Sequence, residues 1–130
     1  MKFFLVFLFT SLAPAAFAQQ DTALRVFDKV EVEAEFREPG GWAGFLTQNL
    51  KSNVPVKRHA PAGTYPVVVQ FIIGKDGSID NITPLTNFGY GMEEEVMRVI
   101  RKSPKWQPAM QNGRPVKAYR KQPINFIVSK

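Results

Sequence analysis

Few residues in this sequence could do chemistry, and none has the neighbours that catalysis needs. His59 is the only histidine and there is no cysteine, so neither a multi-histidine metal site nor a thiolate nucleophile can form. No serine lies in a G-x-S-x-G turn, and Gly89-x-Gly91 lacks the rest of a phosphate-binding loop. We therefore expect no catalytic residue, no cofactor and no metal, and we place His59 in a solvated loop beside Lys57 and Arg58.

The charged residues are distributed unevenly along the chain. Six acids and three bases lie within residues 19–39, whereas nine bases and no acid follow Glu95. A cationic C-terminal third suits an acidic partner, although a merely solvated surface would look the same. Nucleic acid is not expected, because no aromatic and basic recognition motif is present. The acids Glu93, Glu94 and Glu95 are explained by the first turn of a helix, where the positive helix end favours them.

The N-terminal residues read as a targeting segment. Lys2 precedes an apolar run over residues 3–12, and Ala16-Phe17-Ala18 has the small-x-small pattern of a cleavage site. We expect a signal peptide at residues 1–18 and one domain at residues 19–130, with its core at about 26–128. The alternative is an uncleaved membrane anchor, but Pro14 interrupts the run, which is shorter than the roughly 20 residues that span a bilayer. The protein is thus expected to be exported to a bacterial envelope compartment, or anchored in a membrane if the segment is kept.

The first half of the domain is predicted to form a strand, a helix and a hairpin. Alternating residues predict a half-buried strand at 26–35. Apolar residues at helical spacing from Trp42 predict a helix that ends near 52–53, because Pro55 disfavours helix before it, and residues 57–63 are expected to be a polar connector. Residues 64–73 are rich in β-branched residues and predict a central strand. Lys75-Asp76-Gly77 predicts a tight turn, and residues 78–85 return as a strand whose irregular spacing suggests a bulge or an early end near Pro84.

The second half is predicted to add a helix and a last long strand. Met92, Val96, Val99 and Ile100 form one apolar helix face, and the helix should stop at Ser103-Pro104. Residues 106–110 and 116–128 are expected to be extended, with a turn at 111–113. The order β-α-β-β-α-β predicts an α+β domain, an antiparallel sheet with two helices packed on one face. Phe71 and Trp106 are expected in its core.

Short sequence landmarks spread over residues 26–128 resemble one known family. The densest are Pro104-Lys105-Trp106-Gln107-Pro108-Ala109, Asn112-Gly113-Arg114-Pro115-Val116 and Pro123-Ile124-Asn125-Phe126. In this order and spacing the mature chain looks like the C-terminal domain of the TonB energy transducers, in the variant common among Bacteroidetes-like bacteria.

This resemblance implies a protein-binding role in the periplasm, with the domain anchored in the inner membrane if the N-terminal segment is kept. Such domains contact an outer-membrane transporter and couple it to an inner-membrane motor, and they bind an extended transporter peptide along an open sheet edge. The last strand, with cations beside it, fits that requirement. The resulting candidate partner-binding residues are Arg120, Lys121, Gln122, Ile124, Asn125, Phe126, Ile127 and Val128.

One departure from the family leaves the role open. Energy transducers of this family resemble a membrane helix followed by a long proline-rich spacer and then this domain, whereas here only a short segment separates Ala18 from Val26. The alternative is an accessory cell-envelope module that binds peptidoglycan or another acidic envelope partner without transducing energy. A homodimer is a further alternative that the sequence leaves open.

Overall fold

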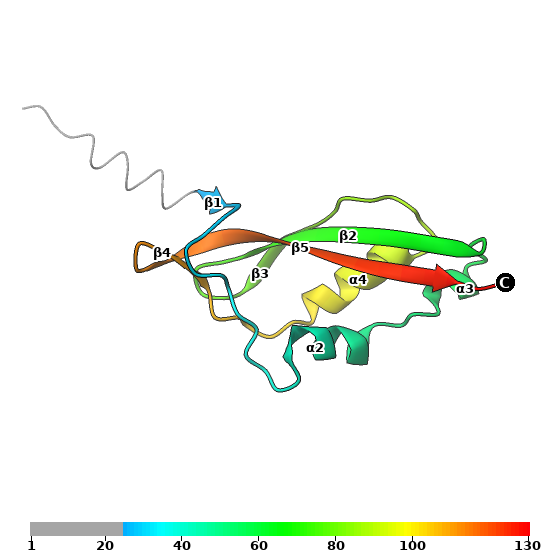
Figure 1. Ribbon diagram of the computed structural model, residues 1–130, viewed down its shortest axis with the longest axis horizontal. Coiled ribbons are helices and arrows are strands. Elements are labelled where there is room, and N and C mark those ends of the chain that lie inside the picture. The colour runs from blue at the N-terminus through cyan, green and yellow to red at the C-terminus, as the bar shows by residue number, and fades with distance from the viewer. Residues whose placement is uncertain (1–24) are drawn as a thin grey trace, which may run out of the picture.

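Two long strands form the centre of the computed structural model, which describes residues 25–130. β2 (Gly63–Ile73) and β5 (Arg114–Val128) pair antiparallel from Gly63↔Val128 to Ile73↔Ala118, and they lie side by side along the molecule (Figure 1). β3 (Ile79–Pro84) pairs antiparallel with the other side of β2, and β4 (Ala109–Gln111) pairs with the start of β5. β1 (Val26–Phe27) runs parallel to β5. The predicted α+β class is confirmed, with the refinement that the sheet is mixed.

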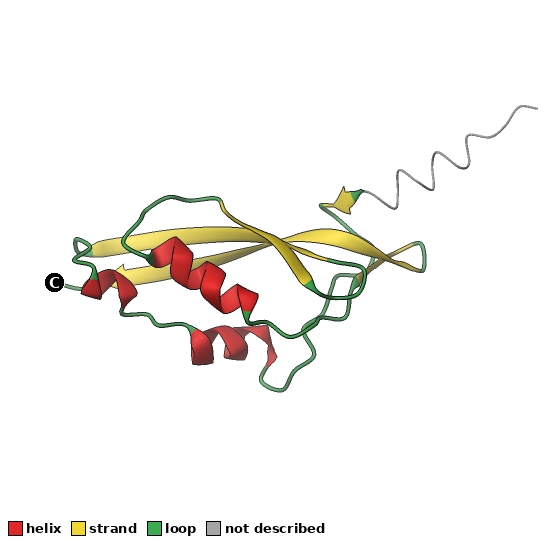
Figure 2. Cartoon of the chain, turned by 180° about the vertical axis from the view of Figure 1, so that it is seen from behind, coloured by secondary structure: helices red, strands yellow, loops and turns green. Residues whose placement is uncertain are grey.

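Two helices cover one face of this sheet. α2 (Gly41–Asn49) and α4 (Met92–Arg101) lie on the same side of the strands, as Figure 2 shows, and a short helix α3 (Val54–Lys57) follows α2. The apolar face predicted for α4 is confirmed, because its members are all fully buried against β2. Acids fill the first turn of α4 and Arg98 and Arg101 its last turns, which is the arrangement that the helix dipole favours.

The core between the helices and β2 contains an aromatic cluster. Phe71 is 0% exposed and Trp106 4%, so the prediction that both are buried is confirmed. The rings of Trp42 and Trp106 meet edge to face with centroids 4.9 Å apart, and Phe36 packs on both. Edge-to-face contacts of this kind stabilise aromatic clusters beyond the area that they bury.

The β2–β3 turn has the conformation that its residues predicted. Gly77 has φ +87°, and its N–H donates to the carbonyl of Gly74 at 2.9 Å. The Asp76 carboxylate accepts hydrogen bonds from the N–H and the hydroxyl of Ser78, which lower its pKa. The carbonyl of Gly77 accepts a hydrogen bond from the N–H of Trp106 at 2.9 Å. The turn therefore anchors the chain that carries the central tryptophan.

The expected irregularity of β3 is also present. The β2–β3 register shifts between Gln70 and Ile72, and β3 ends at Pro84. Pro84 has no N–H to continue the ladder. The strand that was predicted to run to residue 85 is thus slightly shorter and bulged.

The predicted strand at residues 26–35 is wrong beyond Phe27. After β1 the chain bends and makes only isolated bridges, from Val32 to Met110 and from Glu35 to Gln107. Val30 and Ala34 pack against the cluster formed by Phe27, Ala109, Val116 and Ala118. This segment therefore crosses over the buried side of β5 instead of running along it, which an alternating sequence pattern cannot distinguish from a strand.

The predicted end of the first helix is also wrong. α2 stops at Asn49, and α3 begins at Val54, where Pro55 occupies its first turn. Proline suits the first turn of a helix because its missing N–H has no partner there in any case. Pro55 thus lies at the start of the separate helix α3, whereas the sequence predicted no helix between residue 53 and the connector. The proposed signal peptide lies outside the described residues.

Candidate functional site

The direction of the main-chain groups of β5 follows from its pairing with β2. Both main-chain groups of Val68 face β3, since its N–H donates to Thr86 Oγ1 at 3.2 Å and its carbonyl accepts from Leu85 N–H at 2.9 Å. Val68 lies opposite Pro123 on β5. Because the main-chain groups of Val68 face β3, the two residues form a non-hydrogen-bonded pair of the antiparallel ladder. The main-chain groups of Pro123 therefore point to the outer side of β5, and those of every second residue from 119 to 127 do the same.

This outer side of β5 is a free sheet edge. β1 pairs only with Lys117 and Ala118, and no other strand of the described residues pairs with the outer side from residue 119 onward. Tyr119, Lys121, Asn125 and Ile127 turn both N–H and C=O away from β2, toward this unpaired side. These four residues and Pro123 are called the β5 edge below.

Pro123 divides the β5 edge into two halves. It has no N–H, and its carbonyl accepts a hydrogen bond from the Gln122 side chain, Nε2, at 2.8 Å. Proline within a sheet is confined to positions where its nitrogen faces away from a partner strand. An added strand would find its main-chain partners around Tyr119 and Lys121 and again around Asn125 and Ile127.

Side chains of β5 alternate between two environments. Phe126 is 2% exposed and faces the helices, whereas Ile127 is 70% exposed on the opposite face. Of the candidate residues named from the sequence, Lys121, Asn125 and Ile127 belong to the β5 edge. The others, Arg120, Gln122, Ile124, Phe126 and Val128, pair their main chain with β2 and point their side chains toward the helix layer.

Arg120 lies in a different place from its neighbour Lys121. Its guanidinium carbon is 5.0 Å from the ring centroid of Trp106, and burial lowers its pKa, partly offset by the charge of Glu33. Lys121 is exposed on the other face. Sequence reasoning grouped the two cations as equal flanks of the strand, but only Lys121 is a solvated surface charge.

Part of the acidic N-terminal stretch faces this basic end of the molecule. Glu31 Oε1 accepts a hydrogen bond from Asn112 N–H at 2.8 Å, and Gln111 Oε1 accepts one from Glu31 N–H at 2.9 Å. Glu33 contributes its charge near Arg120. The uneven charge that the sequence shows is therefore partly balanced within the fold.

Comparison with known families assigns the chain. Residues 64–128, half of the 130 residues, match the family model described as Gram-negative bacterial TonB protein C-terminal. The chain belongs to this family. No curated protein matches this sequence. The resemblance stated from short landmarks is thus confirmed, and the family is one of non-enzymatic protein-interaction domains of the Gram-negative envelope.

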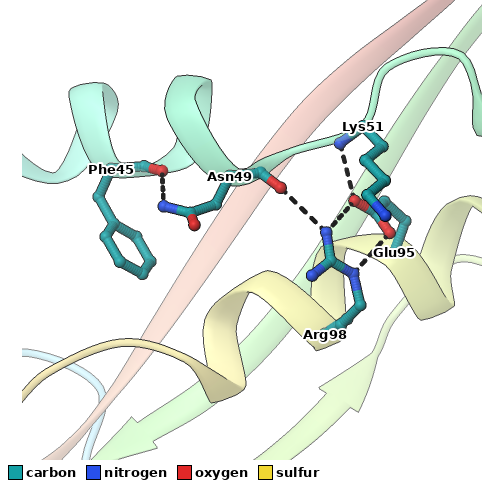
Figure 3. Close-up of polar contacts among 5 residues, drawn as sticks. All are labelled: Phe45, Asn49, Lys51, Glu95 and Arg98. Carbon is teal, nitrogen blue, oxygen red and sulfur yellow. Dashed lines mark hydrogen bonds and ion pairs between the residues drawn. The ribbon is translucent and has the colours of Figure 1, made fainter.

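In this TonB C-terminal domain, a charged cluster ties α2 to α4 (Figure 3). The Glu95 carboxylate accepts hydrogen bonds from Arg98 Nε at 2.9 Å, from Arg98 Nη2 at 2.6 Å and from Lys51 N–H at 2.7 Å. Arg98 Nη2 also donates to the Asn49 carbonyl at the end of α2. Burial would raise the pKa of Glu95, but the bonds from Arg98 and Lys51 lower it below 4.5. The cluster fixes the C-terminal end of α2.

The β3–α4 loop of the TonB domain is held by a second buried carboxylate. Glu93 accepts hydrogen bonds from Thr86 Oγ1, Phe88 N–H and Gly89 N–H at 2.8–3.0 Å. Burial favours a higher pKa, but these bonds bring the pKa of Glu93 below 4.5. The Glu93 and Glu95 carboxylates thus do more than favour the first turn of α4, since each also holds a neighbouring loop or helix end in place.

His59 and the acidic residues of the described part of the chain, residues 25–130, form no metal-binding cluster. His59 is exposed after α3 and has φ +64°. Within residues 25–130 there is no group of three or more histidine, cysteine, aspartate or glutamate residues that could hold a metal ion. No helix in this range is long and apolar enough to span a membrane. Tyr119 and Pro123 are the edge residues that sequence reasoning missed, and only the register with β2 identifies them.

Proposed function

We propose that this domain binds an extended segment of an outer-membrane transporter, or of another envelope protein, by adding a strand to the β5 edge. The observation that supports this is that β5 has no partner strand on its outer side over residues 119–127, while its inner side pairs with β2 along the same residues. Main-chain pairing supplies the affinity in this mode of recognition, and side chains supply the specificity.

The surroundings of the β5 edge suit a transient partner. The gap at Pro123 and the charge of Lys121 both oppose unwanted pairing between identical edges. Trp42 and the Glu95–Arg98 cluster hold α2 in place beneath the sheet, so the edge is presented by a fixed scaffold. A preorganised edge binds with less loss of conformational entropy than a mobile one.

Site-specific photo-crosslinking in envelope preparations tests where a partner binds. A photoreactive residue at Ile127 should crosslink to a transporter or other envelope protein, and mass spectrometry should map the crosslink to an extended segment of it. The matched control is the same residue at Leu85, which is exposed after β3 at the opposite side of the sheet. Equal crosslinking from both positions, or none from Ile127, would contradict the proposal.

Proline substitution tests the main-chain mechanism. Asn125→Pro removes an outward N–H without removing a bond to β2, and should weaken binding of the mapped segment about tenfold, since one lost hydrogen bond and the ring both disturb the new ladder. Asn125→Thr keeps the N–H and should bind as the native protein does. Circular dichroism must show both variants folded. Native affinity in a folded Asn125→Pro variant would exclude pairing at this edge.

Export is a separate part of the proposal. We infer that residues 1–18 are removed and that the domain acts in the periplasm, from the order of Lys2, the apolar run and Ala16-Phe17-Ala18. The intact mass of protein from an envelope fraction should correspond to a chain that begins at Gln19. A mature chain that retains Met1 would instead indicate a membrane-anchored form.

A further inference from the structure

Arg120 is a half-buried cation that has no ion-pair partner among residues 25–130. Its Nε is buried and has no hydrogen-bond acceptor among residues 25–130, and none of the ion pairs formed within this range involves it. The guanidinium packs on Trp106 at 5.0 Å, and Glu33 acts on it only through its charge. The part of the chain that the structure describes therefore contains a desolvated donor that none of its own groups satisfies.

Such a group is unfavourable for the isolated domain. Partial burial removes some of the water around the guanidinium, and an unpaired charge that is desolvated in this way is less favourable than an apolar side chain of similar size. The cation–π contact with Trp106 offsets part of this cost. A residue that destabilises the isolated domain in this way is expected to have a functional role, such as binding a partner.

The position of Arg120 indicates which kind of group could pair with its charge. Arg120 lies at the start of the free part of β5, two residues beyond the Ala118 that pairs with Phe27 of β1. A strand added to the β5 edge would place one residue directly across from Arg120, with its side chain on the same face, because cross-strand neighbours share a face of the sheet. Their Cβ atoms would be about 5 Å apart. A carboxylate at that position could accept hydrogen bonds from the two Nη groups of the guanidinium, which, unlike Nε, are not fully buried.

We propose that Arg120 recognises a carboxylate on the incoming strand, so that the bound peptide carries Asp or Glu at the position facing Arg120. This rests on the strand addition proposed above and specifies its peptide. The next two peptide residues on this face of the sheet lie across from Gln122 and Ile124. We therefore expect a polar residue opposite Gln122 and an apolar residue opposite Ile124. Lys121 has a different role: its exposed charge on the opposite face accelerates the approach of acidic peptides without selecting the position of the acid.

A position scan separates recognition from general attraction. The probes are fluorescein-labelled nine-residue peptides of alternating Thr and Val, with capped ends, in which a single Asp is moved through every position. Binding to the protein purified from an envelope fraction is followed by fluorescence anisotropy at about 0.15 M salt, where exposed charges are screened beyond about 8 Å. The neutral peptide should bind weakly, and Asp at one position should tighten binding about tenfold.

Arg120→Gln and Lys121→Gln form the matched pair of variants. Arg120→Gln should abolish the gain from the favoured Asp position, so that this variant binds the Asp peptide and the neutral peptide with the same affinity. Lys121→Gln should weaken all Asp peptides by a similar, smaller factor that disappears at high salt. Arg120→Met should also unfold at an equal or higher urea concentration than the native protein, because it removes an unsatisfied charge.

The outcomes distinguish this inference from the function on which it rests. If the neutral peptide binds but the affinity is independent of Asp position, or Arg120→Gln keeps the gain, the inference is overturned and strand addition stands. A marked loss of stability in Arg120→Met would likewise overturn it, because Arg120 would then be needed for the fold itself. If no peptide binds to the native protein, strand addition and the role of Arg120 fail together.

Discussion

The indole Nε1 of Trp42 donates a hydrogen bond of 2.7 Å to the side-chain Oε1 of Gln122, and this bond joins α2 to β5. The same Gln122 side chain donates through Nε2 to the Pro123 carbonyl. One side chain thus fastens the helix to the strand and also occupies the middle of the β5 edge. The stability of α2 and the form of the edge are therefore linked.

Replacing Gln122 by alanine should destabilise the domain. The nearly buried Trp42 indole N–H would lose its acceptor, which costs about 1–3 kcal/mol in the free energy of unfolding. Urea denaturation followed by circular dichroism measures this loss. Asn125→Ala, on the exposed face of the same strand, is the control and should change stability by less than about 0.5 kcal/mol. Equal midpoints for the two variants would show that the Trp42–Gln122 bond contributes nothing.

Two glycines with similar backbone angles should respond differently to alanine. Gly77 and Gly113 have φ +87° and +74°, but a Cβ at Gly77 would lie 1.9 Å from the Trp106 carbonyl oxygen, while none of the described atoms lies within 4 Å of a Cβ at Gly113. Gly113→Ala should cost about 1–2 kcal/mol from the left-handed backbone alone. Gly77→Ala should cost about 1–3 kcal/mol more, since the chain carrying Trp106 must move. Thermal unfolding of both variants checks this, and equal costs would contradict the close packing at Gly77.

The stabilisation by Glu93 should depend on pH. Its pKa in the folded domain is below the ordinary 4.5, so the ionised form contributes stability above pH 4.5, and this contribution is lost as the pH falls through the folded-state pKa. Glu93→Gln cannot ionise and should be less stable than the native protein by about 1–3 kcal/mol at pH 7. Its amide group has only one acceptor oxygen for the N–H groups of Phe88 and Gly89, which the carboxylate binds with two. Urea midpoints between pH 7 and pH 3 should converge at the acid end. The exposed Glu94→Gln is the control, and a pH-independent difference for Glu93→Gln would refute the assignment.

Restoring an N–H in the middle of the β5 edge should promote self-association. Pro123→Val gives the edge a continuous row of donors, and two such edges can pair with each other. With one added bond from each chain, the dimer dissociation constant should fall about tenfold. Sedimentation equilibrium measures it, and Asn125→Val controls for added apolar surface without a new donor. If the two variants associate equally, the interruption at Pro123 has no protective effect.

Several features of the fold could be read from local sequence because local forces decide them. The Asp76-Gly77 turn depends on residues that tolerate positive φ, and the buried face of α4 follows from apolar residues spaced for one side of a helix. Pro55, in contrast, was read as the end of a helix and begins one, since proline fits both contexts and only the path of the chain selects between them.

The candidate site shows the same division. Residue types and their spacing were enough to predict the last strand, the alternation of its side chains and the cations near it. Which main-chain groups face outward depends on how β5 pairs with β2: the register between Val68 and Pro123 sets this, and a shift of one residue would reverse it. The tertiary structure also decided that Arg120 lies against Trp106 while Lys121 faces solvent. Burial and register are properties of contacts between distant segments, and a local pattern of residues does not contain them.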